Sequence, residues 1–269
     1  MLKFLTLSIL ISCQSFAMQK NHNSCGKLVC KEIPDIEDSI ISIKKDTKTF
    51  NKNQIKLAVW NIYKNKKDGF EQKYETLQNT NDFLMIQEAL HDGENETMHI
   101  RANHNFDMAV SFIRKNNQKT GVATLAPIVP TAVKIIRTMD KEPIVKTPKA
   151  ALLTKYLIDN REILLINIHS LNATNTSKFL RQLEEIGKFL NDYKEPIIFA
   201  GDFNTRNKDR MEKLLAFMAL HYLEKVPIFT EKNLDHIFAK DINVIKFTHE
   251  VSEYSDHPIL FLTFNFEID

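Results

Sequence analysis

Residues 196–204, with the sequence PIIFAGDFN, pass from an apolar run to a group of polar side chains. The run 196–200 is short and rich in isoleucine, which predicts a buried β-strand. Gly201 lets the backbone approach its neighbours closely. Asp202 and Asn204 are two positions apart, so on an extended chain their side chains point the same way. This stretch therefore predicts a buried strand that carries two polar groups toward one point at its end.

Ten other short apolar runs, rich in Val, Ile, Leu and Phe, lie between turn-forming residues and predict further strands. They cover residues 55–60, 83–87, 106–113, 122–126, 132–136, 150–158, 163–168, 234–239, 244–248 and 258–264. Helical spacing of apolar residues marks 179–190 and 211–218, and we expect three or four helices in all. Two packed sheets with helices outside them would bury these runs.

The composition is that of an ordinary globular protein. Of its 269 residues, 43% are hydrophobic and 26% are charged, which excludes a disordered or fibrous chain. The 36 Lys and Arg residues nearly balance the 34 Asp and Glu residues. The formal net charge of +2 is too small to indicate nucleic-acid binding by itself.

The amino terminus has the outline of a secretory signal peptide. Residues 1–17 contain one lysine, an apolar run over 4–11, and small or polar residues up to Ala17. Alternatively, residues 10–13 (LISC) resemble a bacterial lipoprotein box, in which case processing before Cys13 would leave a lipid anchor there. No segment reaches the ~20 apolar residues of a membrane span. We expect an exported protein, periplasmic or secreted.

Residues 18–53 are predicted to form a polar leader into a domain that covers 54–269. The leader contains Cys25 and Cys30, an even pair that can close a small disulfide loop in an oxidising compartment. Two cysteines without nearby histidines make an incomplete zinc site, so the disulfide is the better interpretation.

Polar side chains recur where the predicted strands give way to loops, which is where active sites tend to be assembled. Each of them alone is weak evidence for an active site, because Asn and Asp commonly satisfy backbone donors at strand ends. Their recurrence at six strand ends predicts one shared site, with these members: Asn61; Gln87 and Glu88; Asn167 and His169; Asp202 and Asn204; Asp235 and His236; Asp256 and His257.

In this pattern the chain resembles the endonuclease/exonuclease/phosphatase superfamily, from about Leu57 to the carboxyl terminus. The most specific elements are Gly201-Asp202-Phe203-Asn204 and Ser255-Asp256-His257-Pro258, supported by the residues at 60–61, 87–88, 121–123 and 234–235. Residues 142–143, 148–149, 167–169 and 234–238 are most similar to its YafD-like bacterial branch. The resemblance implies a four-layer α/β/β/α sandwich whose residues 54–269 form the catalytic domain.

Hydrolysis of a phosphoester needs added negative charge to be stabilised, and a hard divalent cation does much of this. Mg²⁺ prefers oxygen ligands from one or two carboxylates, and Mn²⁺ is an alternative. Glu88 fits this role, assisted by Asn61 and by Asp256 directly or through water. The chain offers no Cys or multi-His cluster for a dedicated zinc site.

The remaining residues suit the chemistry at phosphorus. Asp202 can orient or deprotonate the attacking water, and Asn204 can donate to a phosphoryl oxygen. His257 can bind the phosphate or act as a base, and the resemblance implies that Asp235 orients it. His169 is suited to donate a hydrogen bond to the scissile phosphate and a proton to the leaving oxygen. His236 matches no functional position of the family and is expected to be structural.

The sequence does not decide which class of phosphoester is the substrate. Lysines at 64–67, Lys115, Lys119, Arg206 and Arg210 would give a nuclease its phosphate contacts. A phosphatase or phospholipase C-like enzyme acting on phosphoinositides or sphingomyelin is the alternative, although no exposed aromatic hairpin is evident for a lipid surface. A binding module without activity is disfavoured, because every motif position holds a competent residue. We expect a monomeric nuclease.

Overall fold

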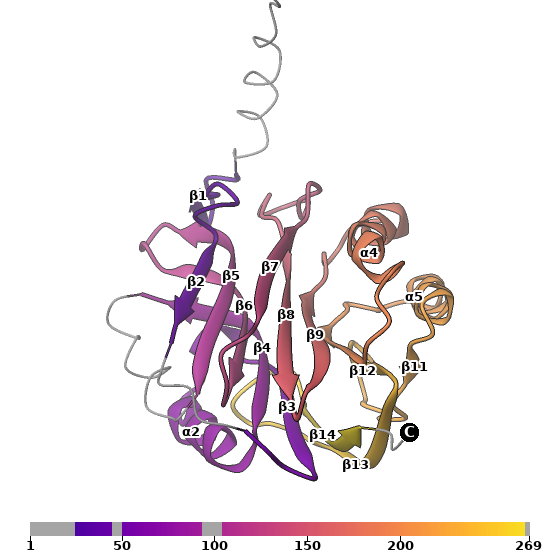
Figure 1. Ribbon diagram of the computed structural model, residues 1–269. Helices are drawn as coiled ribbons and strands as arrows, with labels where there is room; N and C mark the ends of the chain where they lie inside the picture. The colour runs from indigo at the N-terminus through magenta and orange to yellow at the C-terminus, as the bar shows by residue number, and fades with distance from the viewer. Residues whose placement is uncertain (1–24, 45–49, 93–103, 267–269) are drawn as a thin grey trace, which may run out of the picture.

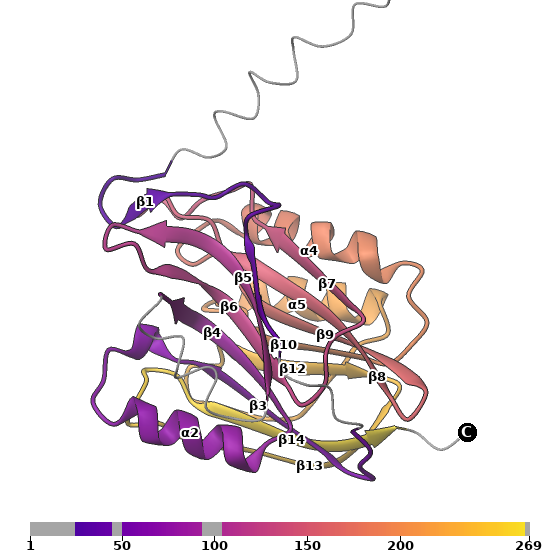
Figure 2. The same cartoon turned by 60° about the vertical axis from the view of Figure 1, so that its left-hand side comes forward.

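Two β-sheets pack face to face, with helices on their outer faces (Figures 1 and 2). The computed structural model describes residues 25–44, 50–92 and 104–266. The predictions for residues 1–17, with the alternative of a lipid anchor at Cys13, fall outside these ranges. The predicted four-layer α/β/β/α sandwich is confirmed.

The first sheet holds the amino-terminal strands together with the last two. Its strands are β1 (Cys30–Glu32), β2 (Ile40–Ile43), β3 (Ile55–Asn61), β4 (Phe83–His91), β5 (Asn105–Arg114), β6 (Lys119–Ala126), β13 (Ile242–Glu250) and β14 (Ile259–Phe266). Within the described ranges they lie in the order β1-β5-β6-β4-β3-β14-β13, with β2 also paired to β5. The β3 strand lies between β4 and β14, so the residues that end β3 are close to those that precede β14.

The second sheet holds the middle of the chain. It consists of β7 (Ala132–Arg137), β8 (Ala150–Ile158), β9 (Arg161–His169), β10 (Ile197–Asp202), β11 (Glu224–Lys225) and β12 (Asp235–Lys240). Their order in the described structure is β11-β12-β10-β9-β8-β7. The central strand β10 runs parallel to β9 and antiparallel to β12.

Three helices cover the outer faces of the described sandwich. Helix α2 (Phe70–Thr80) packs on the first sheet through Phe70, Tyr74 and Leu77, which recur on one helical face. Helices α4 (Thr176–Leu190) and α5 (Lys208–Leu220) pack on the second sheet (Figure 1). In the part of the chain that the structure describes, no helix is long and apolar enough to cross a membrane.

The main core lies between the two sheets because alternate residues of each strand point to opposite faces. In β3, Ile55, Leu57 and Val59 face the second sheet, whereas Ala58 and Trp60 face α2. Both sets are buried, which explains why the strand is a continuous apolar run from Leu57 to Trp60, after the exposed Lys56, rather than an alternating pattern.

The predicted polar leader, residues 18–53, is part of the sandwich where it is described. Cys25 and Cys30 form a disulfide, as their spacing predicts. Both β1 and β2, which the sequence does not predict, pair with β5 and extend the first sheet. Most of their residues are partly or fully exposed, so they lack the apolar run that identifies a buried strand.

Candidate active site

Three of the predicted residues are brought into one row by neighbouring strands of the second sheet. Asp202, at the end of β10, lies in register with His169 at the end of β9. On its other side Asp202 is paired with Asp235, the first residue of β12. Since paired positions on adjacent strands lie close together, strand register alone gathers these three side chains.

The backbone around Asp202 requires the residues found there. Gly201 has φ of 139°, and a Cβ at this position would lie 2.1 Å from the carbonyl oxygen of Ile168. Asn204 has φ of 51°, and its N–H donates to Asp202 Oδ1 at 2.9 Å, which closes a tight turn. The side-chain amide of Asn204 donates to the carbonyl of Ser170 at 3.0 Å. Asn204 is thereby a residue that positions the Asp202 carboxylate, with its amide already engaged.

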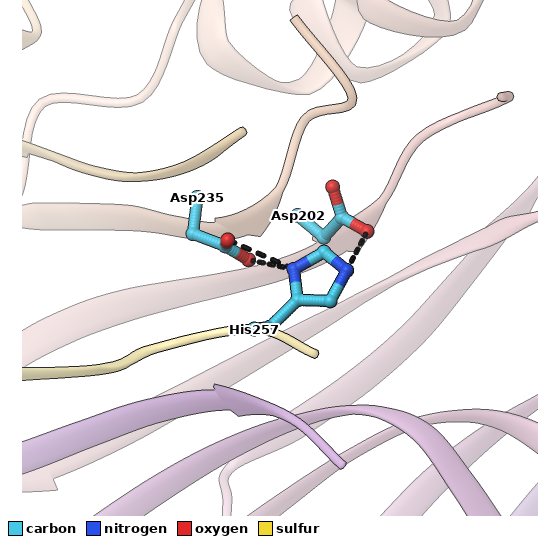
Figure 3. A group of neighbouring side chains, drawn as sticks. All are labelled: Asp202, Asp235 and His257. Carbon is cyan, nitrogen blue, oxygen red and sulfur yellow. Dashed lines mark hydrogen bonds and ion pairs between the residues drawn. The ribbon is translucent and has the colours of Figure 1, made fainter. Parts of the chain in front are cut away.

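His257 lies between the two aspartates, as Figure 3 shows. Its Nδ1 is 2.9 and 3.0 Å from the two carboxylate oxygens of Asp235, and its Nε2 is 3.8 Å from Asp202 Oδ2. The predicted contact between Asp235 and His257 is therefore present. It fixes the imidazole so that Nε2 faces Asp202.

The environment favours a charged His257. Burial by itself lowers the pKa of His257, but the hydrogen bond and charge of Asp235, with the charge of Asp202, raise it to about 9. For Asp202, burial and then the charge of Asp235 raise the pKa above its ordinary value. The site thus pairs an imidazolium with a carboxylate that takes up a proton more readily than an exposed one.

His169 is a second imidazole of the site, and its pKa is shifted in the direction opposite to that of His257. Its Nε2 lies 3.4 Å from Asp202 Oδ2. Burial, followed by the positive charges of Lys149 and Lys64, holds the pKa of His169 well below its ordinary value. A neutral His169 can donate a hydrogen bond but has no extra proton to give, which favours the first of its two expected roles.

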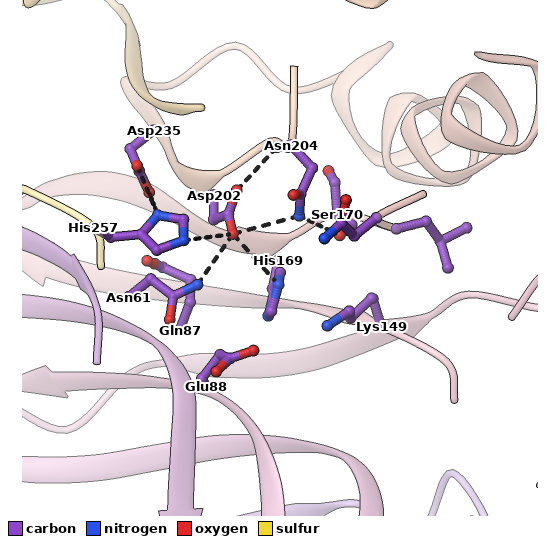
Figure 4. Close-up of polar contacts among 12 residues, drawn as sticks. Asn61, Gln87, Glu88, Lys149, His169, Ser170, Asp202, Asn204, Asp235 and His257 are labelled. Carbon is purple, nitrogen blue, oxygen red and sulfur yellow. Dashed lines mark hydrogen bonds and ion pairs between the residues drawn. The ribbon is translucent and has the colours of Figure 1, made fainter. Parts of the chain in front are cut away.

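The first sheet contributes Asn61 and Ser255 to the same site. Asn61, the last residue of β3, donates from Nδ2 to Asp202 Oδ2 at 3.0 Å and accepts from the N–H of Tyr63 at 3.1 Å. Ser255 donates from Oγ to the carbonyl of Asn61 at 2.6 Å and accepts from the N–H of His257 at 3.1 Å. Asn61 therefore joins the two sheets directly at Asp202 (Figure 4).

Glu88 is aimed by an irregularity in its strand. The pairing of β4 with β6 shifts register between Gln87 and Ala89, and Glu88 has φ of 56°, as at a β-bulge. Its carboxylate forms an ion pair with Lys64, with Nζ 2.5 Å from Oε2. Burial alone would raise the pKa of Glu88, but the charges of Lys64 and Lys149 outweigh it and the pKa is lowered. Glu88 is thus held as an anion.

Glu88 and Asn61 fit the binding of a hard divalent cation. Both offer oxygen atoms, and their parts of the chain are adjacent because Asn61 is in register with Gln87. Glu88 Oε2 is buried and accepts no hydrogen bond from the described residues apart from its ion pair with Lys64. A divalent cation would replace the ammonium there. Asp256, the third predicted ligand, is exposed, and its Oδ1 is 4.0 Å from His257 Nε2.

A second group of donor atoms could hold a metal ion. The donor atoms of Asp202, Asp235 and His257 all lie within 4.8 Å of one another. His257 Nδ1 is already bonded to Asp235, which makes this trio better suited to proton transfer and anion binding than to metal binding.

The structure also shows the surroundings of Asn167, a predicted member of the site without an assigned role, and of Lys149. Asn167 lies buried between the sheets, where its Oδ1 accepts from Gln87 Nε2 at 2.7 Å and its Nδ2 donates to the carbonyl of Ala123 at 2.8 Å. Lys149 is close to His169 and Glu88 (Figure 4). Lys149, which is not among the predicted site residues, lies in a stretch that carries the family resemblance, and that is the signal that could have identified it.

One expected phosphate contact is wrong. Arg210 is buried and donates from its guanidinium to the carbonyls of Asn204 and Leu171 at 2.8 and 2.7 Å. Arg210 lies in the first turn of α5, where its guanidinium binds the loop after β10 and is not available to a substrate phosphate. His236 is buried as expected, with Nε2 2.8 Å from Thr205 Oγ1.

Comparisons with known proteins identify the family of this chain. Residues 58–257 match the model of the Endonuclease/Exonuclease/phosphatase family. A UPF0294 protein of Photorhabdus laumondii is 31% identical over 222 residues, which is 79% of this chain and 84% of that protein.

Solved structures of low sequence identity share the fold. A family member from Bacteroides thetaiotaomicron has a TM-score of 0.64 at 14% identity, over 80% of this chain and 99% of that one. A mannosyl-6-phosphatase from the same species has a TM-score of 0.61 at 16% identity, over 79% of this chain and 100% of that one. Together with the sequence match, they show that this chain belongs to the endonuclease/exonuclease/phosphatase family, in its YafD-like UPF0294 branch.

Proposed function

We propose that this phosphoesterase-family protein is an exported, Mg²⁺-dependent phosphodiesterase that cleaves nucleic acid. One observation carries the proposal: Asp202 Oδ2 is surrounded by side-chain nitrogens of Asn61, His169 and His257 at 3.0, 3.4 and 3.8 Å. A buried carboxylate among hydrogen-bond donors, two of them imidazoles, suits the activation of water beside an anionic ester.

Asp202 acts as the general base in this proposal. Its carboxylate accepts the proton of the attacking water while Asn61 and the backbone N–H of Asn204 hold it in place. The raised pKa of Asp202 supports the role, because a base is most effective when its pKa approaches the working pH.

The two imidazoles act on the phosphoryl group in different protonation states. His257, positively charged and held by Asp235, attracts an anionic phosphoryl oxygen through Nε2. His169 is neutral and also lies beside Asp202, where it donates a hydrogen bond to a phosphoryl oxygen. Both contacts strengthen as negative charge accumulates on phosphorus in the transition state.

Glu88 would hold the Mg²⁺ ion, with Asn61 and, directly or through water, Asp256. The ion would neutralise the added negative charge and that of the leaving alkoxide. Lys64, which pairs with Glu88, keeps that carboxylate ionised until the cation replaces the ammonium.

Nucleic acid is the proposed substrate because cationic side chains gather beside the catalytic groups. Lys64, Lys66, Arg114 and Lys149 line a pocket that also contains His169 and Glu88. Export is supported by the signal-like pattern of residues 1–17 and by the disulfide of Cys25 with Cys30. A small phosphomonoester is the second candidate, favoured by the modest pocket volume of about 300 Å³.

A panel of substrates tests the proposal. Purified protein with Mg²⁺, Mn²⁺ or EDTA would be incubated with DNA, RNA, phosphoinositides, sphingomyelin vesicles and sugar phosphates. We expect metal-dependent cleavage of DNA or RNA that the Asp202→Asn variant lacks. Release of inorganic phosphate from sugar phosphates with intact nucleic acid would replace the nuclease by the phosphatase, and turnover of none of the esters would refute both.

A further inference from the structure

A cationic pocket of about 300 Å³ lies beside the row formed by His169, Asp202 and Asp235. His169 lines this pocket and also lies 3.4 Å from Asp202, so the pocket adjoins the proposed general base at this histidine. Figure 4 shows Lys149 and Glu88 in the neighbourhood of His169. A substrate whose scissile phosphate reaches Asp202 and His169 therefore places its adjoining unit in or near this pocket.

The charges that line the pocket leave an excess of cations. Four cationic side chains, Lys64, Lys66, Arg114 and Lys149, share it with two carboxylates. Those carboxylates already have partners: Glu88 contacts Lys64 at 2.5 Å and Glu142 contacts Lys149 at 3.4 Å.

Two of these cations have no acidic partner in the described ranges. Lys66 lies over the ring of Tyr63 at 4.3 Å, and Arg114 donates to the side-chain oxygen of Gln118 at 2.5 Å. If Glu88 holds a metal ion, Lys64 loses its partner as well. The pocket, which His169 and Glu88 also line, therefore suits an anionic group of the substrate.

The amino-terminal disulfide loop forms one wall of the pocket. Val29, inside the loop closed by Cys25 and Cys30, lines the pocket together with Val145. A Cβ placed on Gly26 would lie 2.5 Å from the carbonyl oxygen of Val145, so the two loops are in direct backbone contact. Beneath them Phe112 packs against Cys30. The loops limit the length of substrate that this side of the site can take.

The volume of the pocket also limits the size of the group that it can bind. Small-molecule sites span about 300–1,000 Å³, and this pocket is at the lower end of that range. It has room for a single nucleotide-sized unit. A continuous duplex would have to extend in another direction.

We propose that this pocket binds the terminal phosphate of a nucleic-acid strand, so that the enzyme cleaves near strand ends. The inference rests on the proposed nuclease function and adds to it a preference for ends that carry a phosphate. Arg114 and Lys66 contact the terminal phosphate, Val29 and Val145 contact the terminal nucleoside, and the disulfide loop closes the far side.

Uncleavable dinucleotides test the proposal by binding alone. The probes are thymidine and uridine dinucleotides with a methylphosphonate linkage, carrying a 5′-phosphate, a 3′-phosphate or no terminal phosphate. Their dissociation constants for the wild-type protein with Mg²⁺ would be measured by calorimetry. We expect one phosphorylated form to bind at least about tenfold more tightly than the unphosphorylated one, as one charge-assisted contact provides.

Matched variants assign that preference to the pocket. Arg114→Gln and Lys66→Gln should each reduce it to less than about threefold. Lys27→Gln, which removes an exposed lysine of the same loop outside the pocket, should leave it intact. Equal affinity for all probes, no measurable binding of any, or a preference that survives Arg114→Gln would overturn the proposal. So would tight binding of inositol 1,4-bisphosphate with none of the dinucleotides.

These binding measurements, together with the substrate panel repeated on oligonucleotides with and without terminal phosphates, separate this inference from the nuclease proposal. Phosphate-dependent binding without hydrolysis of any ester would keep the pocket and refute the nuclease. Cleavage of nucleic acid without a preference for phosphorylated ends would keep the nuclease and refute the pocket.

Discussion

His257 presents Nδ1 to both carboxylate oxygens of Asp235, at 2.9 and 3.0 Å, although 22 positions separate the two residues in the chain. The strand β12 and the turn before β14 bring them together at the boundary of the two sheets. Because Nδ1 is engaged, Nε2 is the atom left for the substrate and faces Asp202.

A double-mutant cycle tests whether this pair works as a unit. His257→Ala should lower kcat/KM by about 10²–10⁴, since electrostatic and acid–base contributions have that size. Asp235→Asn should act through His257, so the double variant should lose much less than the product of the two single losses. Additive losses in free energy would show that Asp235 does not position His257.

The protonation of His257 can be followed directly. Nuclear magnetic resonance titration of the metal-free protein should place the pKa of His257 at about 9, because Asp235 and Asp202 outweigh the effect of burial. In the Asp235→Asn variant the pKa should fall, since the main group that raises it is neutralised. An unchanged pKa in that variant would contradict the assigned cause.

Metal affinity should depend on Glu88 and Lys64 in opposite directions. Glu88→Gln should weaken Mn²⁺ binding at least about tenfold, because a neutral amide replaces an anionic oxygen ligand. Lys64→Met should strengthen it, because the cation no longer competes with an ammonium 2.5 Å from the carboxylate. Electron paramagnetic resonance measures free Mn²⁺ in each case. If Glu88→Gln binds Mn²⁺ as the wild type does, the metal lies elsewhere.

His236 should make the fold sensitive to acid. Burial, assisted by the charge of Lys225, lowers the pKa of His236 to about 3, whereas the unfolded chain has the ordinary value of 6.5. Below pH 6.5 His236 binds a proton in the unfolded state but not in the folded state. The free energy of unfolding therefore falls as the pH drops toward 3. The slope from this one group is at most about 1.4 kcal/mol per pH unit.

The variant His236→Gln isolates this contribution. Between pH 6 and 4 its free energy of unfolding, from urea titrations, should fall less steeply than that of the wild type. The exposed His249 provides the control, and His249→Gln should keep the wild-type slope. Equal slopes for wild type and His236→Gln would show that His236 is not responsible.

The sequence predicts the buried strands well and the peripheral elements poorly. The strands that pack on both faces, such as β3 and β10, appear as apolar runs because both sets of side chains are buried. Helix α2 is not located because its three apolar residues stand among eight polar ones, with Phe70, Tyr74 and Leu77 as the only signal. The edge strands β1 and β2 are short and largely exposed, so no apolar pattern marks them.

The same division holds for the site. Asp202, Asp235 and His257 are predictable because each lies in a motif next to a strand whose register follows from the fold. The ion pair of Lys64 with Glu88 is not, because it depends on a β-bulge that aims Glu88 and on an irregular turn that carries Lys64. The prediction for Arg210 is wrong because an arginine in a helical pattern is expected to be exposed. Its burial depends on the fold of the loop after β10, which the sequence pattern does not show.

The central claim is that Asp202 activates water for attack on a phosphodiester. The most direct test is single-turnover cleavage of a labelled oligonucleotide, DNA or RNA as the panel selects, by wild type and Asp202→Asn at saturating Mg²⁺. We expect the variant to keep its thermal stability and oligonucleotide affinity but to cleave about 10²–10⁴ times more slowly. Cleavage by Asp202→Asn within a few-fold of the wild-type rate would contradict the account.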